Sequence, residues 1–228
     1  MRKISKLHFI TTNAGTAEQA CLGGVRWVQL RIKDASYDVY KAEALKVQAI
    51  CKLHGATFII NDNVALAKEI GADGVHIGKE DMSPAEARAL LGNDFIIGCT
   101  ANTAEEIKQL VQHPIDYIGL GPYKFTDTKK NLSPVLGLDG YDIILTHLNW
   151  KGVKTPPIIG IGGITEEDVP ALMSTRLHGI AVSGAIATAG SVQHAAGRFI
   201  KLVHPGFPTG SAIEGLRAVV DIATIFTT

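Results

Sequence analysis

Eight short segments rich in Val, Ile and Phe recur along this chain, separated by longer segments whose apolar residues return every three or four positions. The short segments predict buried strands, and the longer ones predict helices packed against them. Strands that alternate with helices pair in parallel through right-handed crossovers. Eight such units in 228 residues fit a closed barrel better than an open sheet. The sequence therefore predicts an α/β protein with a single (β/α)8, or TIM, barrel.

The segment boundaries follow from this periodicity and from helix-capping residues. Ser83 and Glu86 form a capping box around Pro84, and Thr103 and Thr165 each precede an acidic first turn. We expect strands over His8–Thr12, Trp27–Lys33, Thr57–Asn61, Gly74–Ile77, Ile96–Thr100, Tyr117–Gly119, Ile158–Gly160 and Gly179–Val182. We expect helices over Ala17–Cys21, Tyr37–Leu53, Val64–Glu69, Pro84–Leu91, Ala104–Val111, Tyr141–Leu148, Glu166–Met173 and Val192–Val203.

The barrel accounts for most of the chain. No linker divides it, so we expect one domain over residues 1–204, followed by a tail over residues 205–228 whose role the sequence does not assign. The polar stretch Lys124–Gly140 is longer than the usual connection and predicts a functional loop. Cys21, Cys51 and Cys99 lie far apart without metal-ligand spacing. We expect Cys21 and Cys51 to be small buried residues, and we leave Cys99 open.

Charge and hydropathy exclude several classes of partner. Basic and acidic residues number 22 each, so no net charge attracts nucleic acid or an anionic membrane. The longest run without charged side chains, Leu177–Gly197, is broken by Gly, His and Ser, a composition that predicts no membrane span. The N-terminus lacks the apolar core of a signal peptide. We expect a cytoplasmic protein whose oligomeric state, a homo-oligomer included, stays open.

Polar residues follow the early strands, where a barrel of this type carries its active site. Gln29, Arg31 and Lys33 are spaced two apart, so a strand would point all three to one side. The alternative is a polar plug, or a structural ion pair of Arg31. Asp62 and Asp81 follow the third and fourth strands and predict a Mg2+ site, with helix N-capping as the alternative. We interpret His76, inside the fourth strand, as a hydrogen-bonded histidine that is either part of the core or supports a residue of the site.

The later strands end in residues suited to anions. Thr126, Thr128 and Lys129 lie on the long loop after the sixth strand, for which a merely solvated loop is the alternative. Glycines after the seventh and eighth strands predict a phosphate site, since they let backbone N–H groups approach a ligand. The two halves of this rim imply two phosphorylated substrates. No Ser or Cys has an evident His partner, so leaving-group departure is favoured over covalent catalysis.

Five motifs, in this order and spacing, resemble thiamine phosphate synthase over residues 7–203. They are Val28–Lys33, Ile60–Asp62, Gly74–Asp81, Gly121–Lys130 and Gly160–Ile164. The resemblance implies an enzyme, a transferase that condenses hydroxymethylpyrimidine pyrophosphate with thiazole phosphate to give thiamine phosphate and pyrophosphate. It also implies Mg2+ and a dissociative mechanism, in which pyrophosphate leaves before the thiazole nitrogen attacks and no general base is needed.

The resemblance also assigns roles residue by residue. It places Asp62 and Asp81 on Mg2+, Gln29 on the pyrimidine, and Thr100 at the fifth-strand contact with substrate. The pyrophosphate would be held by Arg31, Lys33, Asn61 and Lys129, of which Arg31, Lys33 and Lys129 would be catalytic. The thiazole phosphate would contact Thr126, Thr128, Gly162, Gly163, Ser183 and Gly184.

Some positions depart from the family pattern. Lys79 stands where Gln is usual, Thr100 where Ser is usual, and Asn102 where His is usual. Asp127 replaces a common Pro, and Ser183-Gly184 is shifted relative to the usual Val-Ser. A related thiazole tautomerase is the nearest rival, but Asn102 offers it no imidazole for proton transfer. A non-catalytic sensor of phosphorylated ligands and another phosphate-handling barrel enzyme are further alternatives.

Overall fold

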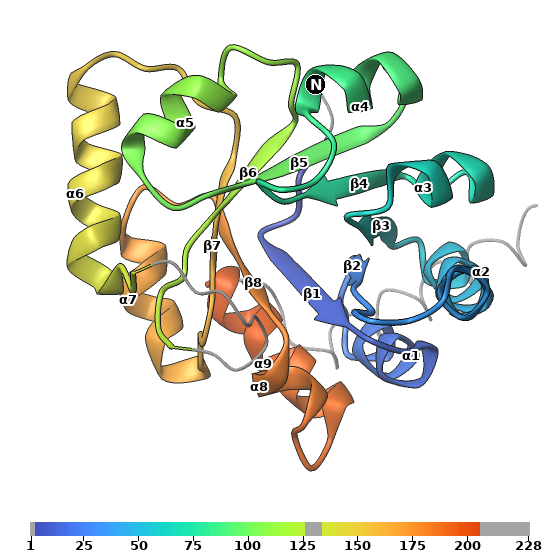
Figure 1. Cartoon of the computed structure of the whole chain (residues 1–228). Helices are drawn as coiled ribbons and strands as arrows, with labels where there is room; N and C mark the ends of the chain where they lie inside the picture. The colour runs from blue at the N-terminus through green and yellow to red at the C-terminus, as the bar shows by residue number, and fades with distance from the viewer. Residues whose placement is uncertain (1–2, 126–133, 206–228) are drawn as a thin grey trace, which may run out of the picture.

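The computed structural model describes residues 3–125 and 134–205, and within them eight parallel strands close into a barrel in sequence order. Pairing of Leu7 with Ile180 and of Phe9 with Val182 joins the first strand to the last. Figure 1 shows the strands at the centre and the helices around them. The predicted barrel is confirmed, with strands β1 (Leu7–Thr11), β2 (Trp27–Leu30), β3 (Thr57–Asn61), β4 (Gly74–Ile77), β5 (Ile96–Ala101), β6 (Tyr117–Leu120), β7 (Ile158–Ile161) and β8 (Gly179–Val182).

One strand is shorter than predicted. β2 ends at Leu30 rather than at Lys33, although the Arg31 N–H still donates to the Thr11 carbonyl at 2.8 Å. Asp34 then adopts a positive φ of 61°, which turns the chain away from the sheet. Arg31 and Lys33 therefore lie on the loop after the strand, at the predicted rim. Their side-chain directions are not set by the alternation of a strand.

α4 and α5 begin at their predicted capping residues, whereas α1 and α6 begin three and four residues earlier than predicted. Ser83 forms the capping box with Glu86, and Thr103 accepts the N–H of Glu106. The predicted seventh helix is split at Asp168 into a short 3-10 helix and α7. α8 was not predicted. The helices are α1 (Ala14–Leu22), α2 (Tyr37–His54), α3 (Val64–Ile70), α4 (Pro84–Leu91), α5 (Ala104–Leu110), α6 (Gly137–Trp150), η1 (Glu166–Asp168), α7 (Val169–Ser174), α8 (Gly184–Ala187) and α9 (Val192–Val203).

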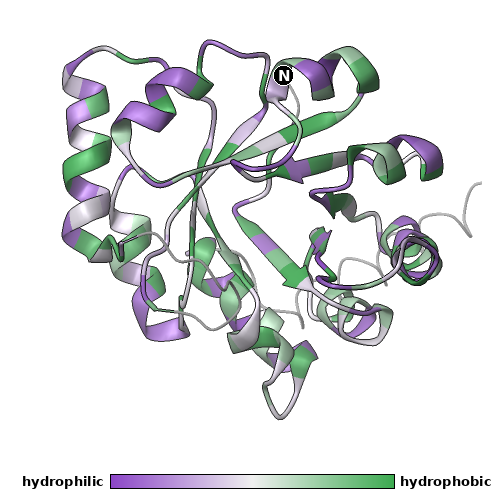
Figure 2. Cartoon of the chain, in the orientation of Figure 1, coloured by the Kyte–Doolittle hydropathy of each residue, from purple (hydrophilic) through white to green (hydrophobic). Residues whose placement is uncertain are grey.

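Apolar side chains fill both sides of the sheet. Figure 2 shows hydrophobic residues along the strands and mixed colouring on the helices that cover them. The side chains inside the barrel form their own cluster, separate from the larger core between sheet and helices. Within the described residues, we find no helix long and apolar enough to cross a membrane. The last helix ends at Val203, and the predicted tail lies almost wholly outside the described residues, so its separation from the barrel domain stays a prediction.

Aromatic rings occupy the interior of the barrel. Trp27 and Tyr117 are fully buried and meet edge to face, with ring centroids 5.5 Å apart. His8 stacks on Trp27 at 4.2 Å, and burial lowers the pKa of this imidazole well below its ordinary value, so the ring is neutral. Gly98 makes room for Tyr117, because a Cβ at this position would lie 2.0 Å from the phenol ring. The absence of a side chain at Gly98 is thus a packing requirement.

We predict that Gly98→Ala destabilises the protein. The added methyl group forces the buried phenol of Tyr117 to move, and overpacking of this kind costs about 1–3 kcal/mol. Each kcal/mol lowers Tm by about 2–4 °C in a chain of this size, which calorimetry or circular dichroism measures. The control is Gly190→Ala, where a Cβ meets nothing within 4 Å. Equal melting temperatures for the two variants would contradict the packing argument.

Candidate active site

The ends of β2 and β3 are joined by side chains. Gln29 is buried in the barrel, and its amide donates to the Asn61 side-chain oxygen at 2.8 Å. The Tyr40 hydroxyl, from α2, donates to the Leu30 carbonyl at 2.7 Å and accepts the Asn61 N–H at 3.2 Å. Sequence reasoning missed Tyr40, whose place in the apolar pattern of the helix concealed its polar role. These bonds fix the backbone next to Arg31 and Asp62.

Asp62 and Asp81 both lie at this rim, and neither is the N-cap of the following helix. Asn63 caps α3 by accepting the Leu66 N–H at 2.9 Å, and Ser83 caps α4. The Asp62 backbone has a positive φ of 63°, an uncommon conformation for a residue other than glycine. The helix-capping alternative is therefore wrong for both aspartates.

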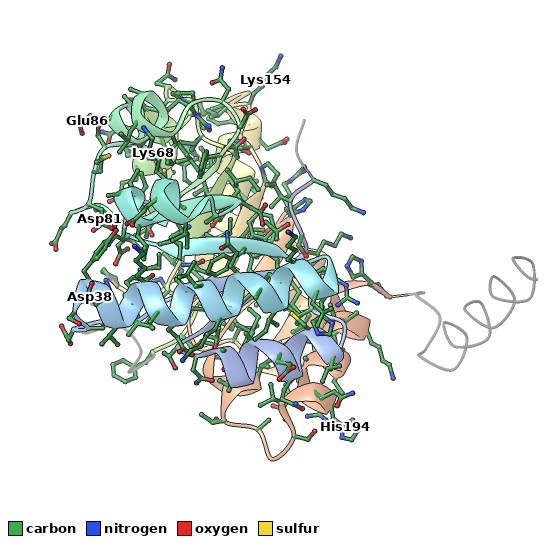
Figure 3. The ribbon with its side chains drawn as sticks, turned by 90° about the vertical axis from the view of Figure 1, so that its right-hand side faces the viewer. Asp38, Lys68, Asp81, Glu86, Lys154 and His194 are labelled. Atoms are coloured by element: carbon green, nitrogen blue, oxygen red, sulfur yellow. The ribbon has the colours of Figure 1, made fainter. Side chains whose placement is uncertain are left out.

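The position of Asp81 is visible in Figure 3, on the same side of the molecule as Asp38 in the first turn of α2. This is the side on which the strands end, because α2 begins after β2. The Asp81 carboxylate accepts the Gly78 N–H at 2.7 Å. Asp62 borders a cavity of about 390 Å³ that is also lined by Met82. Asp81 does not line this cavity but is exposed, so a ligand has access to both aspartates.

The two carboxylates influence each other. Burial, and then the neighbouring Asp62 carboxylate, raise the pKa of Asp81, while the Gly78 N–H and the Lys33 ammonium group oppose that rise. Lys33 forms an ion pair with Asp62. Like charges held together in this way are stabilised by a cation.

A divalent cation fits this donor set, with one restriction. Within residues 3–125 and 134–205, no three His, Cys, Asp or Glu side chains gather into a metal cage. Mg2+ does not need one, because it is commonly bound through one or two carboxylates, with waters and substrate phosphates completing the shell. Asp62 and Asp81 suit that coordination better than they suit a structural metal.

The centre of the rim holds a connected set of polar side chains. The Thr100 hydroxyl lies 3.0 Å from His76 Nε2, and His76 Nδ1 lies 3.0 Å from the Tyr117 hydroxyl. The interpretation of His76 as a hydrogen-bonded histidine is confirmed, since it is buried between these two hydroxyls. Thr100 is only partly buried, at the end of β5, so its hydroxyl reaches the mouth of the barrel.

Two of the residues that depart from the expected sequence pattern, Asn102 and Lys79, contact neighbouring elements. The Asn102 amide donates to the Gly121 carbonyl, which ties the end of β5 to the loop after β6. Lys79 forms an ion pair with Glu106 on α5. Both side chains are thereby engaged in contacts between neighbouring elements.

Glycines after β7 pack closely on the loop after β6. Gly162 and Gly163 have positive φ values of 107° and 63°. A Cβ on Gly162 would lie 2.8 Å from Pro122 Cβ, and one on Gly163 would lie 2.7 Å from the Phe125 carbonyl oxygen. Only glycine combines this backbone with such a close approach.

The end of β8 is more open. Ser183 precedes the short helix α8, and a Cβ on Gly184 would meet nothing within 4 Å. The predicted glycine-lined site therefore has one packed side, after β7, and one open side, after β8. The shifted Ser183-Gly184 pair still falls at the strand end.

The second half of the rim contains an ion pair that sequence reasoning missed. Lys124 Nζ lies 2.6 Å from Asp168, which also accepts the N–H and hydroxyl of Thr165. The capping box at Thr165 signalled the position of Asp168, but not its lysine partner. The predicted residues Thr126, Thr128 and Lys129 lie outside the described residues, so their roles stay predictions.

The cysteines are not part of the site. Cys21, Cys51 and Cys99 are all buried and free of disulfides, which confirms the expectation for the first two. Burial raises the pKa of Cys99 to about 12. Its thiol is therefore protonated at neutral pH and inert as a nucleophile.

Comparison with known proteins places this geometry in a family. The family model described as thiamine monophosphate synthase matches residues 4–186. A thiamine-phosphate synthase of Phocaeicola vulgatus is 50% identical over 190 residues, covering 81% of this chain and 91% of that protein. One of Bacteroides fragilis is 52% identical over 171 residues, covering 75% and 83%. The structure of thiamine phosphate pyrophosphorylase from Pyrococcus furiosus superposes with a TM-score of 0.77 at 28% identity, covering 87% of this chain and 95% of that one.

We predict that none of the three cysteines reacts with a disulfide reagent such as DTNB in the native protein at pH 8. Their burial excludes the reagent, and the raised pKa of Cys99 leaves almost no thiolate. All three should react in denaturant. Rapid release of one equivalent of thionitrobenzoate from the folded protein would contradict the assignment of these thiols to the core.

Proposed function

The chain belongs to the thiamine monophosphate synthase family, and we propose on that basis that it joins hydroxymethylpyrimidine pyrophosphate to thiazole phosphate. The products would be thiamine phosphate and pyrophosphate. One observation carries the proposal: two carboxylates and a lysine, Asp62, Asp81 and Lys33, meet beside a polar barrel mouth, opposite a glycine-lined strand end. A tautomerase of the thiazole alone would need no diphosphate site.

In this proposal the first side of the rim binds the pyrophosphate. Arg31 and Lys33 follow β2, and together with the Asn61 amide they offer donors to its oxygens. Asp62 and Asp81 would hold Mg2+, which when bound supplies positive charge beside the phosphate groups. Lys33 would then exchange its Asp62 partner for a phosphate oxygen. The same ammonium group would thus pair with a carboxylate before substrate binds and with the substrate afterwards.

The bond that breaks joins the pyrimidine methylene carbon to the pyrophosphate oxygen. Both bonding electrons leave with pyrophosphate, and the methylene cation is captured by the lone pair of the thiazole nitrogen. No proton is lost from that nitrogen, so no general base is required. Arg31, Lys33 and Lys129 would stabilise the charge that develops on the departing oxygen, and such preorganised electrostatics is commonly the largest contribution to catalysis.

The second side of the rim would hold the thiazole phosphate. Uncharged donors would bind this phosphate. They are the backbone N–H groups of Gly162, Gly163 and Gly184 and the hydroxyl of Ser183. Thr126 and Thr128 would line the thiazole ring. The thiazole nitrogen would thereby face the pyrimidine, held near Gln29 and Thr100.

The reaction is tested by product analysis with both substrates, with and without Mg2+. We expect Mg2+-dependent thiamine phosphate, and we expect Asp81→Ala to lower kcat/KM at least ~100-fold, about 2.7 kcal/mol of barrier. Asp38→Ala is the control, because Asp38 lies on the same side of the molecule but in the first turn of α2. Substrate binding without product would favour a sensor, and turnover of thiazole alone would favour a tautomerase.

A second prediction separates the two substrates. Gly184→Ala should raise the KM for thiazole phosphate about tenfold, about 1.4 kcal/mol, and leave the KM for the pyrimidine substrate unchanged. The added methyl group occupies open space in the structure, so it meets the phosphate rather than the protein. Steady-state kinetics with each substrate varied in turn measures this split. Gly190→Ala serves again as control, and equal changes in both KM values would refute the assignment.

A further inference from the structure

Three side chains connect the buried interior of the barrel to its mouth. Tyr117, at the start of β6, is 1% exposed. Its hydroxyl lies 3.0 Å from His76 Nδ1, and the opposite ring nitrogen of His76 lies 3.0 Å from Thr100 Oγ1. Thr100 is the partly exposed member at the end of β5. This series of two hydrogen bonds thus begins in the core and ends at the mouth of the barrel.

The direction of the first hydrogen bond follows from the phenol. Among the residues that the structure describes, His76 Nδ1 is the hydrogen-bond partner of the Tyr117 hydroxyl. Burial raises the pKa of Tyr117 well above its ordinary value, so the phenol keeps its proton. A buried O–H that finds no acceptor is costly. Tyr117 therefore donates to Nδ1, and Nδ1 carries no hydrogen.

The second hydrogen bond follows from the first. A neutral imidazole has one N–H, so the proton of His76 resides on Nε2 and is donated to Thr100 Oγ1. A threonine hydroxyl that accepts in this way still has its own O–H to donate. Within the described part of the chain, His76 is the only group placed to hydrogen-bond with Thr100 Oγ1. The Thr100 O–H is thus left for a ligand at the barrel mouth.

We propose that Tyr117 is a positioning residue that holds His76 in the Nε2–H tautomer and thereby makes Thr100 a hydrogen-bond donor toward substrate. This inference rests on the proposed function for the identity of that substrate, a pyrimidine whose ring nitrogens carry lone pairs. A ring nitrogen is an acceptor, so it pairs with a donor and not with a second acceptor. The buried phenol of Tyr117 touches no substrate, but it determines that Thr100 donates the hydrogen bond and the substrate accepts it.

The tautomer is measured directly by 15N NMR of the histidine side chains in the protein without substrate. The chain has eight histidines, so the His76 signals are assigned by their absence from His76→Gln. We expect the proton on Nε2 in the wild-type protein and a mixture of tautomers in Tyr117→Phe. Tyr141→Phe is the matched control, because it also removes a buried hydroxyl, one that bonds to backbone of β6 and β7 instead.

Kinetics tests the consequence for substrate. Tyr117→Phe should raise the KM for the pyrimidine substrate about tenfold and leave the KM for thiazole phosphate unchanged, whereas Tyr141→Phe should not produce this split. Thr100→Val should show the same selective loss, and Thr100→Ser should restore the wild-type KM because it keeps the hydroxyl. This second pair of variants remains informative if Tyr117→Phe fails to fold.

The outcomes separate this inference from the proposed function. A wild-type protein that makes thiamine phosphate but carries the His76 proton on Nδ1 overturns the inference alone. An equal rise of both KM values in Tyr117→Phe, with an unchanged tautomer, also overturns it. Absence of thiamine phosphate with the proton on Nε2 overturns the proposed function, while the tautomer assignment stands.

Discussion

The closed interior of the barrel is the constraint on which the rest of this structure depends. Eight parallel strands enclose a fixed volume, and inward-facing side chains must fill it without overlap. Trp27 and Tyr117 are among the largest fully buried side chains of the described residues, and the absence of a side chain at Gly98 leaves room for the Tyr117 ring. His76 is hydrogen-bonded to Tyr117 on one side and to Thr100 on the other, so the aromatic side chains support the polar residues at the mouth of the barrel. The shape of the site therefore depends on the side chains inside the barrel as well as on the loops at its rim.

The rim is held by the same device on both sides of the barrel. The Tyr40 hydroxyl of α2 joins the ends of β2 and β3, and the Tyr141 hydroxyl of α6 joins the ends of β6 and β7. The two helices occupy equivalent places four units apart in the barrel. One brace stands beside the carboxylates and the other beside the glycine-lined strand end. Each half of the rim thus has a separate support.

Local sequence predicted the strands well because their periodicity is a local property, and seven of the eight match to within one residue at either end. It failed at β2, which ends at Leu30 before the chain turns at Asp34, and at the seventh helix, which Asp168 divides. The position of Asp62 at the rim was predicted because the carboxyl ends of parallel strands meet at one edge of the barrel. The ion pair of Asp168 was missed because its Lys124 partner lies 44 residues away.

The sequence by itself determined the order of strands and helices, the rim on which polar residues gather, and the chemistry that those residues offer. Those properties depend on residue type and on spacing along the chain. Only the tertiary structure decided which groups are partners. It paired Lys33 with Asp62, directed Asn102 to Gly121, and set His76 between two hydroxyls. Hydrogen-bond partners and their directions depend on contacts across strands, which no local pattern contains.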